Sequence, residues 1–278
     1  MDSPDTAPDD IQILRERSSR TPIRVVLFDF DGTVSLLREG WPSVMAPVML
    51  EAIAGGAPPT PEMEQAVQEY IEASTGINTI LQMEELVEMV RQFGRVPEDH
   101  ILDAHEYKAI YNERLMQRVN QRIKHLESGE LSCAEATVLG SVDFVKQLRG
   151  MGVTLYVFSG TDQPDVQNEA RLLGVADYFD AIYGALRTYA ESNKEQVLRD
   201  LMNAHRLDGA EVAVFGDGPV EIACGCERNC VTVGVASDEV RGYGWNLDKK
   251  TRLTQAGADA LIPDFSNPTP ILEWLGLI

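Results

Sequence analysis

Six short apolar runs, rich in β-branched residues, alternate with amphipathic segments along this chain of 278 residues. The runs have the composition of strands that are buried on both faces, and the segments between them have the spacing of helices that pack onto a sheet. This alternation predicts an α/β fold, a doubly wound parallel sheet with helices on both faces. The runs are IRVVLF (23–28), VTLYVF (153–158), AIYG (181–184), VAVFG (212–216), VTVGVA (231–236) and ALIP (260–263).

The interval between the first and the second run is far longer than one crossover helix needs. It reads as four helices with few strand signals, at 41–55, 61–74, 79–93 and 98–127. We therefore expect a helical cap domain over residues 38–135, inserted after the first strand. The α/β core would comprise residues 21–37 and 136–278, and the polar residues 1–20 would form a mobile tail outside the fold.

The chain carries a formal net charge of −20, which would repel the phosphates of a nucleic acid. No apolar stretch approaches the length of a membrane span, and the first 20 residues lack the pattern of a signal peptide. The four cysteines do not have the even spread of a disulfide framework, which fits a protein in a reducing compartment. We expect a cytoplasmic protein that binds neither nucleic acid nor membrane, and the sequence leaves monomer and homodimer open.

Polar residues follow the strand runs, where ligands bind in open α/β sheets. Asp29 and Asp31 come directly after the first run, and such a pair can share a magnesium ion or divide into a nucleophile and an acid/base. Ser159 and Gly160 follow the second run and would offer a hydroxyl and backbone N–H groups to a phosphate.

Two further strand ends add a cation and two acids. Lys194 lies in the first turn of a predicted helix, where the helix dipole disfavours a cation unless an anion lies nearby. Asp217 and Glu221 open the helix after the VAVFG run and form a second source of oxygen ligands for a metal. The ordered set of acid pair, hydroxyl, lysine and acid pair is much more specific than any one of these signals.

The ordered motifs DFDGT, FSGT, the isolated Lys194 and GDGPVE resemble the four motifs of the haloacid dehalogenase superfamily, over about residues 23–265. The helical insert is similar to the cap of the subgroup that contains phosphoglycolate phosphatase and β-phosphoglucomutase. The resemblance implies that Asp29 is the nucleophile and Asp31 the general acid/base. The true dehalogenases lack the second aspartate, so its presence favours phosphoryl transfer over carbon–halogen cleavage.

The same resemblance implies the remaining roles. Ser159 and Lys194 would bind the transferring phosphoryl group, with the Thr33 hydroxyl and the Gly160 backbone beside them. The Mg²⁺ cofactor would be held by Asp29, Asp31, Asp217 and Glu221, with direct or water-mediated contact of Glu221 left open.

Substrate choice is expected to reside in the cap. The loop STGINT (74–79) carries Thr75 and Asn78 and breaks two predicted helices, as a specificity loop or as a plain turn. Arg38 and Trp41, where the cap begins, would either clamp a second anion and a ring or form a hinge salt bridge and a packing contact.

The sequence thus predicts a magnesium-dependent phosphatase that hydrolyses a small phosphorylated metabolite through an aspartyl phosphate. A phosphomutase of the β-phosphoglucomutase type is the nearest alternative, because the motifs do not separate the two reactions. An alternative of another class is a non-catalytic module that binds phosphate or acts as a regulatory switch.

Overall fold

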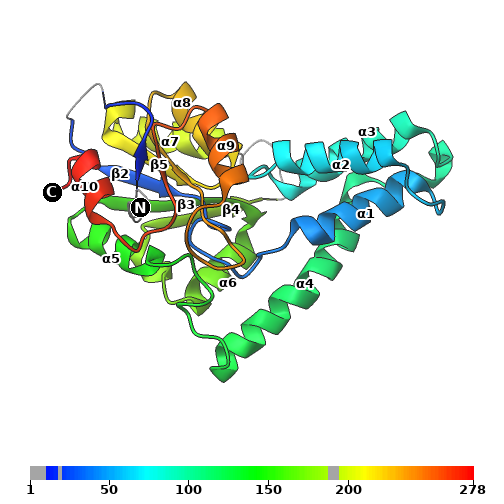
Figure 1. Ribbon diagram of the computed structural model, residues 1–278, viewed down its shortest axis with the longest axis horizontal. Helices are drawn as coiled ribbons and strands as arrows, with labels where there is room; N and C mark the ends of the chain where they lie inside the picture. Colours follow the sequence, from blue (N-terminus) through cyan, green and yellow to red (C-terminus); the bar gives the residue numbers. More distant parts are fainter. Residues whose placement is uncertain (1–10, 18–20, 187–193) are drawn as a thin grey trace, which may run out of the picture.

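The computed structural model describes residues 11–17, 21–186 and 194–278, and its core is a seven-stranded sheet (Figure 1). The order of strands is β1-β7-β6-β5-β2-β3-β4, and every pairing except β1 with β7 is parallel. The predicted α/β class is confirmed. The strands are β1 (Gln12–Ile13), β2 (Val25–Phe28), β3 (Thr154–Asp162), β4 (Ala181–Ala185), β5 (Val212–Gly216), β6 (Val231–Val235) and β7 (Ala260–Ile262).

The central strands are apolar on both sides because helices cover both faces of the sheet. Alternate side chains of β2 pack on opposite faces of the sheet. Val26 and Phe28 belong to the cluster on one face, and Val25 and Leu27 to the cluster on the other. Helices α5 (Ser141–Gly150), α6 (Gln163–Leu172) and α10 (Thr269–Leu275) cover the first face. Helices α7 (Lys194–His205), α8 (Pro219–Glu227) and α9 (Leu247–Gln255) cover the second. Short 3-10 turns span Ala176–Tyr178 and Gly209–Glu211.

Strand β1 departs from the expectation that residues 1–20 lie outside the fold. Gln12 and Ile13 pair antiparallel with Leu261 and Ala260 at the edge of the sheet, and Leu14 donates a backbone hydrogen bond to Asp259. Backbone pairing at an exposed edge needs no apolar pattern, so the polar composition of this segment concealed it. Residues 1–10 and 18–20 of the expected tail lie outside the described part of the chain.

The inserted helices α1 to α4 extend from one end of the sheet and enclose a hydrophobic cluster of their own (Figure 1). Thr60 caps α2, and an Asp103–Glu106 capping box begins α4. The expected helix at 98–127 is therefore divided, with a 3-10 turn at Glu98–His100 before the cap residue. The helices are α1 (Pro42–Ala54), α2 (Pro61–Ala73), α3 (Thr79–Phe93) and α4 (Ala104–Ser128).

The two chain segments that join this helical insert to the sheet lie side by side. Leu36 donates a backbone hydrogen bond to Ala136, and Val138 donates one to Val34. The Arg122 guanidinium on α4 binds the backbone oxygens of Leu36, Leu37 and Glu39. The insert is thus anchored at the carboxyl edge of β2. No helix in the described residues is long and apolar enough to cross a membrane.

Candidate active site

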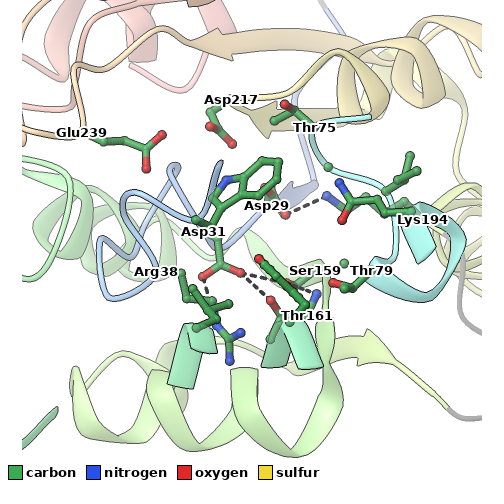
Figure 2. A pocket seen from close by; sticks show the side chains of 17 residues that line it. Asp29, Asp31, Arg38, Thr75, Thr79, Ser159, Thr161, Lys194, Asp217 and Glu239 are labelled. Carbon is green, nitrogen blue, oxygen red and sulfur yellow. Dashed lines mark hydrogen bonds and ion pairs between the residues drawn. The ribbon is translucent and has the colours of Figure 1, made fainter. Parts of the chain in front are cut away.

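The carboxyl ends of β2, β3 and β5 meet in one pocket beneath the inserted helices (Figure 2). Asp29 directly follows β2, and its backbone N–H donates to the carbonyl of Phe215 on β5. Gly32 has a positive φ of 75°, and a Cβ there would lie 2.4 Å from Asp217 Oδ2. A glycine at this turn therefore lets the Asp217 carboxylate approach the backbone that carries both aspartates.

Lys194 is the cation closest to the first aspartate. Its Nζ lies 2.8 Å from Asp29 Oδ1 and also makes a close ion pair with Glu221 Oε1 (Figure 2 shows the first of these). The three side chains are almost completely buried. The anionic partner that we expected for this lysine is present, in the form of two carboxylates. Residues 187–193, directly before it in the chain, lie outside the described residues.

Asp31 is held by hydroxyl groups from the end of β3. Thr161 Oγ1 donates to Asp31 Oδ2 at 2.8 Å, and Ser159 Oγ lies at 3.5 Å from the same oxygen. Ser159 Oγ also accepts a hydrogen bond from the backbone N–H of Thr161. Ser159 and Gly160 line the pocket as predicted, and Thr161, adjacent to them in the sequence, was missed as a contact of Asp31.

The two aspartates lie in surroundings that favour their protonated forms. Burial, opposed by Lys194 and reinforced by Asp217, raises the pKa of Asp29 to about 7 in the metal-free protein. Burial also raises the pKa of Asp31, against the opposing effects of Arg38 and Thr161. The raised pKa of Asp31 favours the protonated form that a general acid needs.

Asp217 is held by a second buried lysine that sequence reasoning missed. Lys249 on α9 lies 2.6 Å from Asp217 Oδ2 and 2.6 Å from Glu239 Oε1. Burial lowers the pKa of Lys249, but the carboxylates of Asp217 and Glu239 outweigh it and raise that pKa above its usual value. Glu239 itself lines the pocket beside Asp217 (Figure 2).

Arg38 lines the pocket, but its guanidinium group already forms ion pairs with carboxylates of the core. Its Nε and Nη2 donate to the buried Glu169 on α6, at 3.0 and 2.6 Å to Oε1, and Nη2 also reaches Asp165 at 3.4 Å. Nε lies 3.9 Å from Asp31 Oδ1. Of the two roles considered for Arg38, this geometry matches the hinge salt bridge. The same residue still contributes positive charge beside Asp31.

The loop between α2 and α3 lies directly against the strand ends. A Cβ on Gly160 would be 2.7 Å from the carbonyl oxygen of Ile77, and one on Gly218 would be 2.8 Å from that of Thr75. A Cβ on Gly76, which has a φ of 94°, would lie 2.3 Å from Glu221 Oε1. The helical insert therefore covers the pocket, and it reaches the loops that carry Ser159 and Asp217.

Only some of the residues predicted to determine substrate specificity line the pocket. Trp41 and Thr75 line the pocket, whereas Asn78 is buried at the N-cap of α3 and is not among the lining residues. Thr33 is fully buried, its hydroxyl has no hydrogen-bond partner in the described residues, and it does not line the pocket. The loop at 74–79 also contributes Gly76, Ile77 and Thr79 to the lining, and the insert adds three lining residues that sequence reasoning did not single out, namely Gln82, Tyr111 and Leu115.

The acids of the pocket have the chemistry of a magnesium site. Buried oxygens of Asp31 and Glu221, Oδ1 and Oε2, have no hydrogen-bond partner, and hard carboxylate oxygens are the ligands that Mg²⁺ prefers. As the side chains lie, no group of three acids, histidines or cysteines in the described residues is arranged to hold a metal ion. Lys194 and Lys249 occupy oxygens of the acids that would serve, so a metal ion would have to compete with these ion pairs.

A family model described as haloacid dehalogenase-like hydrolase matches residues 23–225. Solved structures with the same fold include a predicted phosphatase from Clostridium acetobutylicum, 17% identical, which covers 91% of this chain and 100% of its own with a TM-score of 0.60. A β-phosphoglucomutase from Clostridium difficile is 14% identical, with 91% and 97% coverage and a TM-score of 0.60.

A predicted phosphoglycolate phosphatase from Haemophilus somnus 129pt is 16% identical, with 92% and 99% coverage and a TM-score of 0.58. No curated protein matches the chain. At these identities the structural likeness shows the fold.

Proposed function

Because the chain belongs to the haloacid dehalogenase-like hydrolases, we propose that it is a magnesium-dependent phosphatase of a small phosphorylated metabolite, with Asp29 as nucleophile and Asp31 as acid/base. One observation carries the proposal: the Asp29 carboxylate lies 2.8 Å from Lys194, and Asp31 is held at the same pocket by Thr161. A buried carboxylate beside a cation, with a second carboxyl group whose pKa is raised, is the pair that phosphoryl transfer through an aspartyl phosphate needs.

In the first step Asp29 attacks phosphorus in line with the departing oxygen. The Lys194 ammonium, now bound to Asp29 and Glu221, would neutralise charge on the phosphoryl oxygens. A bound Mg²⁺, held by carboxylates of Asp29, Asp217 and Glu221 with Asp31 beside them, would supply further positive charge there.

Asp31, protonated, transfers its proton to the leaving oxygen and then takes one from the water that hydrolyses the aspartyl phosphate. Thr161 donates to Asp31 Oδ2, whereas Oδ1 has no hydrogen-bond partner and lies 3.9 Å from Arg38 Nε. The loop at 74–79 would limit the access of water during the first step. The four cysteines are free, which supports a cytoplasmic location as part of the proposal.

Phosphate release from a panel of phosphorylated metabolites, with and without Mg²⁺, tests the proposal. We expect release that depends on Mg²⁺, stops reversibly with EDTA and is lost in Asp29→Asn. Unchanged release in Asp29→Asn would refute the assignment. A requirement for a bisphosphate primer, without net release, would instead indicate the phosphomutase.

A further inference from the structure

The wall that the helical insert contributes to the pocket carries no charge. From Trp41 onward, the side chains that line it from this insert are neutral: aromatic, aliphatic, hydroxyl and carboxamide groups. In the proposed reaction this wall faces the leaving group, because the strand ends on the opposite side hold the phosphoryl group. The lining side chains of this wall are Trp41, Thr75, Ile77, Thr79, Gln82, Tyr111 and Leu115.

The two cations that line the pocket beside this wall are already paired. Of the described lining residues only Arg38 and Lys194 are basic. Arg38 donates to Glu169 through Nε and Nη2, and Lys194 pairs with Asp29 and Glu221. A phosphoryl group and Mg²⁺ carry opposite charges, so their entry together would leave the net charge of the pocket about unchanged.

Acids outnumber bases around the pocket. Asp29, Asp31, Asp217 and Glu239 line it against the two basic residues named above. The buried Lys249 behind them is fully used by Asp217 and Glu239. Among the described residues, a second anionic group on the substrate would therefore find no unpaired cation in the pocket lining and would be buried close to carboxylates, which is strongly unfavourable.

Two basic residues on α4, Lys108 and Arg122, already bind other groups. Lys108 binds Asp162 on the core at 2.6 Å, and Arg122 binds Glu39 and the backbone of the linker. Releasing either one toward the pocket would break a contact that joins the helical insert to the core. Neither is therefore a ready receptor for a phosphate or carboxylate of the leaving group.

The neutral wall does offer groups for hydroxyls. The Gln82 carboxamide is buried and donates to the Ser74 backbone oxygen at 3.3 Å and to Ser74 Oγ at 3.1 Å, which fixes its orientation. The Thr75 hydroxyl donates to the Ile71 carbonyl at 3.1 Å and can still accept a hydrogen bond. Trp41 and Tyr111 add ring surfaces against which a carbon skeleton can pack.

We propose that the leaving group of the substrate is an uncharged alcohol that bears further hydroxyl groups, and that phosphate esters carrying a second phosphate or a carboxylate are rejected. This inference rests on the proposed function and deepens it, because it names the substrate class of the same site. It also separates the chain from mutases that require a bisphosphate primer, because that primer carries a second phosphate.

Two esters of nearly the same size test the inference: 2-hydroxyethyl phosphate, with a neutral leaving group, and 2-phosphoglycolate, with a carboxylate. We expect kcat/KM to be at least about 30-fold higher for the neutral ester, since one unpaired charge near a partly buried carboxylate has about this effect. Equal values, or a preference for 2-phosphoglycolate, would overturn the inference.

A charge placed on the neutral wall gives a second, independent readout. Thr79 lines the pocket at the start of α3, so Thr79→Lys would add the missing cation and Thr79→Gln is a control of similar length. We expect Thr79→Lys to shift the ratio of the two kcat/KM values toward 2-phosphoglycolate by about tenfold, and Thr79→Gln to leave the ratio within about twofold. The same ratio in both variants would contradict the inference.

Binding separates a failure of this inference from a failure of the proposed function. Titration calorimetry of the two esters into the Asp29→Asn protein with Mg²⁺ needs no turnover, and tighter binding of 2-hydroxyethyl phosphate supports the neutral-group inference. If wild-type protein releases phosphate from neither ester nor from an aryl phosphate, the proposed function fails, and the binding preference still decides the inference. Equal or tighter binding of 2-phosphoglycolate overturns it.

Discussion

The close approach of Ile77 to Gly160 makes a sharp prediction about the contact between the helical insert and the strand ends. In Gly160→Ala the new Cβ would lie 2.7 Å from the Ile77 carbonyl oxygen and 3.2 Å from that of Gly76. Unstrained carbon–oxygen contacts are roughly 0.6 Å longer than the first of these. Both obstacles are backbone atoms, so the loop at 74–79 must move as a unit.

A forced contact of this size in a packed interface costs about 1–3 kcal/mol. If the closed arrangement is the reactive one, this cost lowers kcat/KM for 2-hydroxyethyl phosphate roughly 5- to 150-fold. Gly150→Ala is the matched control, because a Cβ at that helical glycine meets nothing within 4 Å. We expect this control to retain wild-type kcat/KM.

Hydrogen exchange of the peptide that contains residues 74–79 reports the contact itself. We expect faster exchange in Gly160→Ala than in the wild type or Gly150→Ala, because the loop would be displaced from the strand ends. Identical exchange and identical kinetics in the two alanine variants would show that the loop does not rest on Gly160, and would refute the reasoning.

Three further predictions concern charge and specificity. Asp29 holds a proton in the folded, metal-free protein between its unfolded pKa of 3.8 and its folded pKa of about 7, so the free energy of unfolding falls as pH rises through this window. In denaturation measurements with EDTA, the free energy of unfolding of Asp29→Asn should therefore exceed that of the wild type by up to about 4 kcal/mol at pH 8. Below pH 4 this excess should disappear. A difference that does not change with pH would contradict the raised pKa of Asp29. Lys249→Met should lower the free energy of unfolding by about 3–5 kcal/mol, because two buried carboxylates lose their cation, whereas Lys250→Met should change it by less than about 1 kcal/mol. Thr75→Ala and Trp41→Ala should reduce kcat/KM for the preferred metabolite at least about fivefold more than for an aryl phosphate; equal losses would place specificity outside this wall.

The parts of the fold that follow local pattern were predictable from the sequence. The VAVFG run coincides with β5, and each of the other predicted runs overlaps one strand, because buried parallel strands need continuous apolar runs. The helices of the insert were found through their periodicity and their caps. The site aspartates were placed by the rule that ligands gather at the carboxyl ends of strands.

What the sequence concealed depends on contacts between distant segments. Lys249 lies 32 residues beyond Asp217 and beside a second lysine, and only the packing of α9 on the sheet determines which of the two is buried. The partner of Arg38 is 131 residues away, so the pattern left its role open between an anion clamp and a hinge. A pairing that rests on tertiary packing leaves no local signal in a single sequence.

The most direct test of the account is to identify the residue that becomes phosphorylated. Asp31→Asn should slow hydrolysis of the phosphoenzyme, so incubation with an aryl phosphate and Mg²⁺ should accumulate an acyl phosphate. Borohydride reduction converts an aspartyl phosphate to homoserine, which peptide mass spectrometry can locate. The account predicts homoserine at position 29 and nowhere else, and its loss in the Asp29→Asn/Asp31→Asn double variant. Modification at another residue, or turnover without any acyl phosphate, would contradict the assignment of Asp29 as the nucleophile.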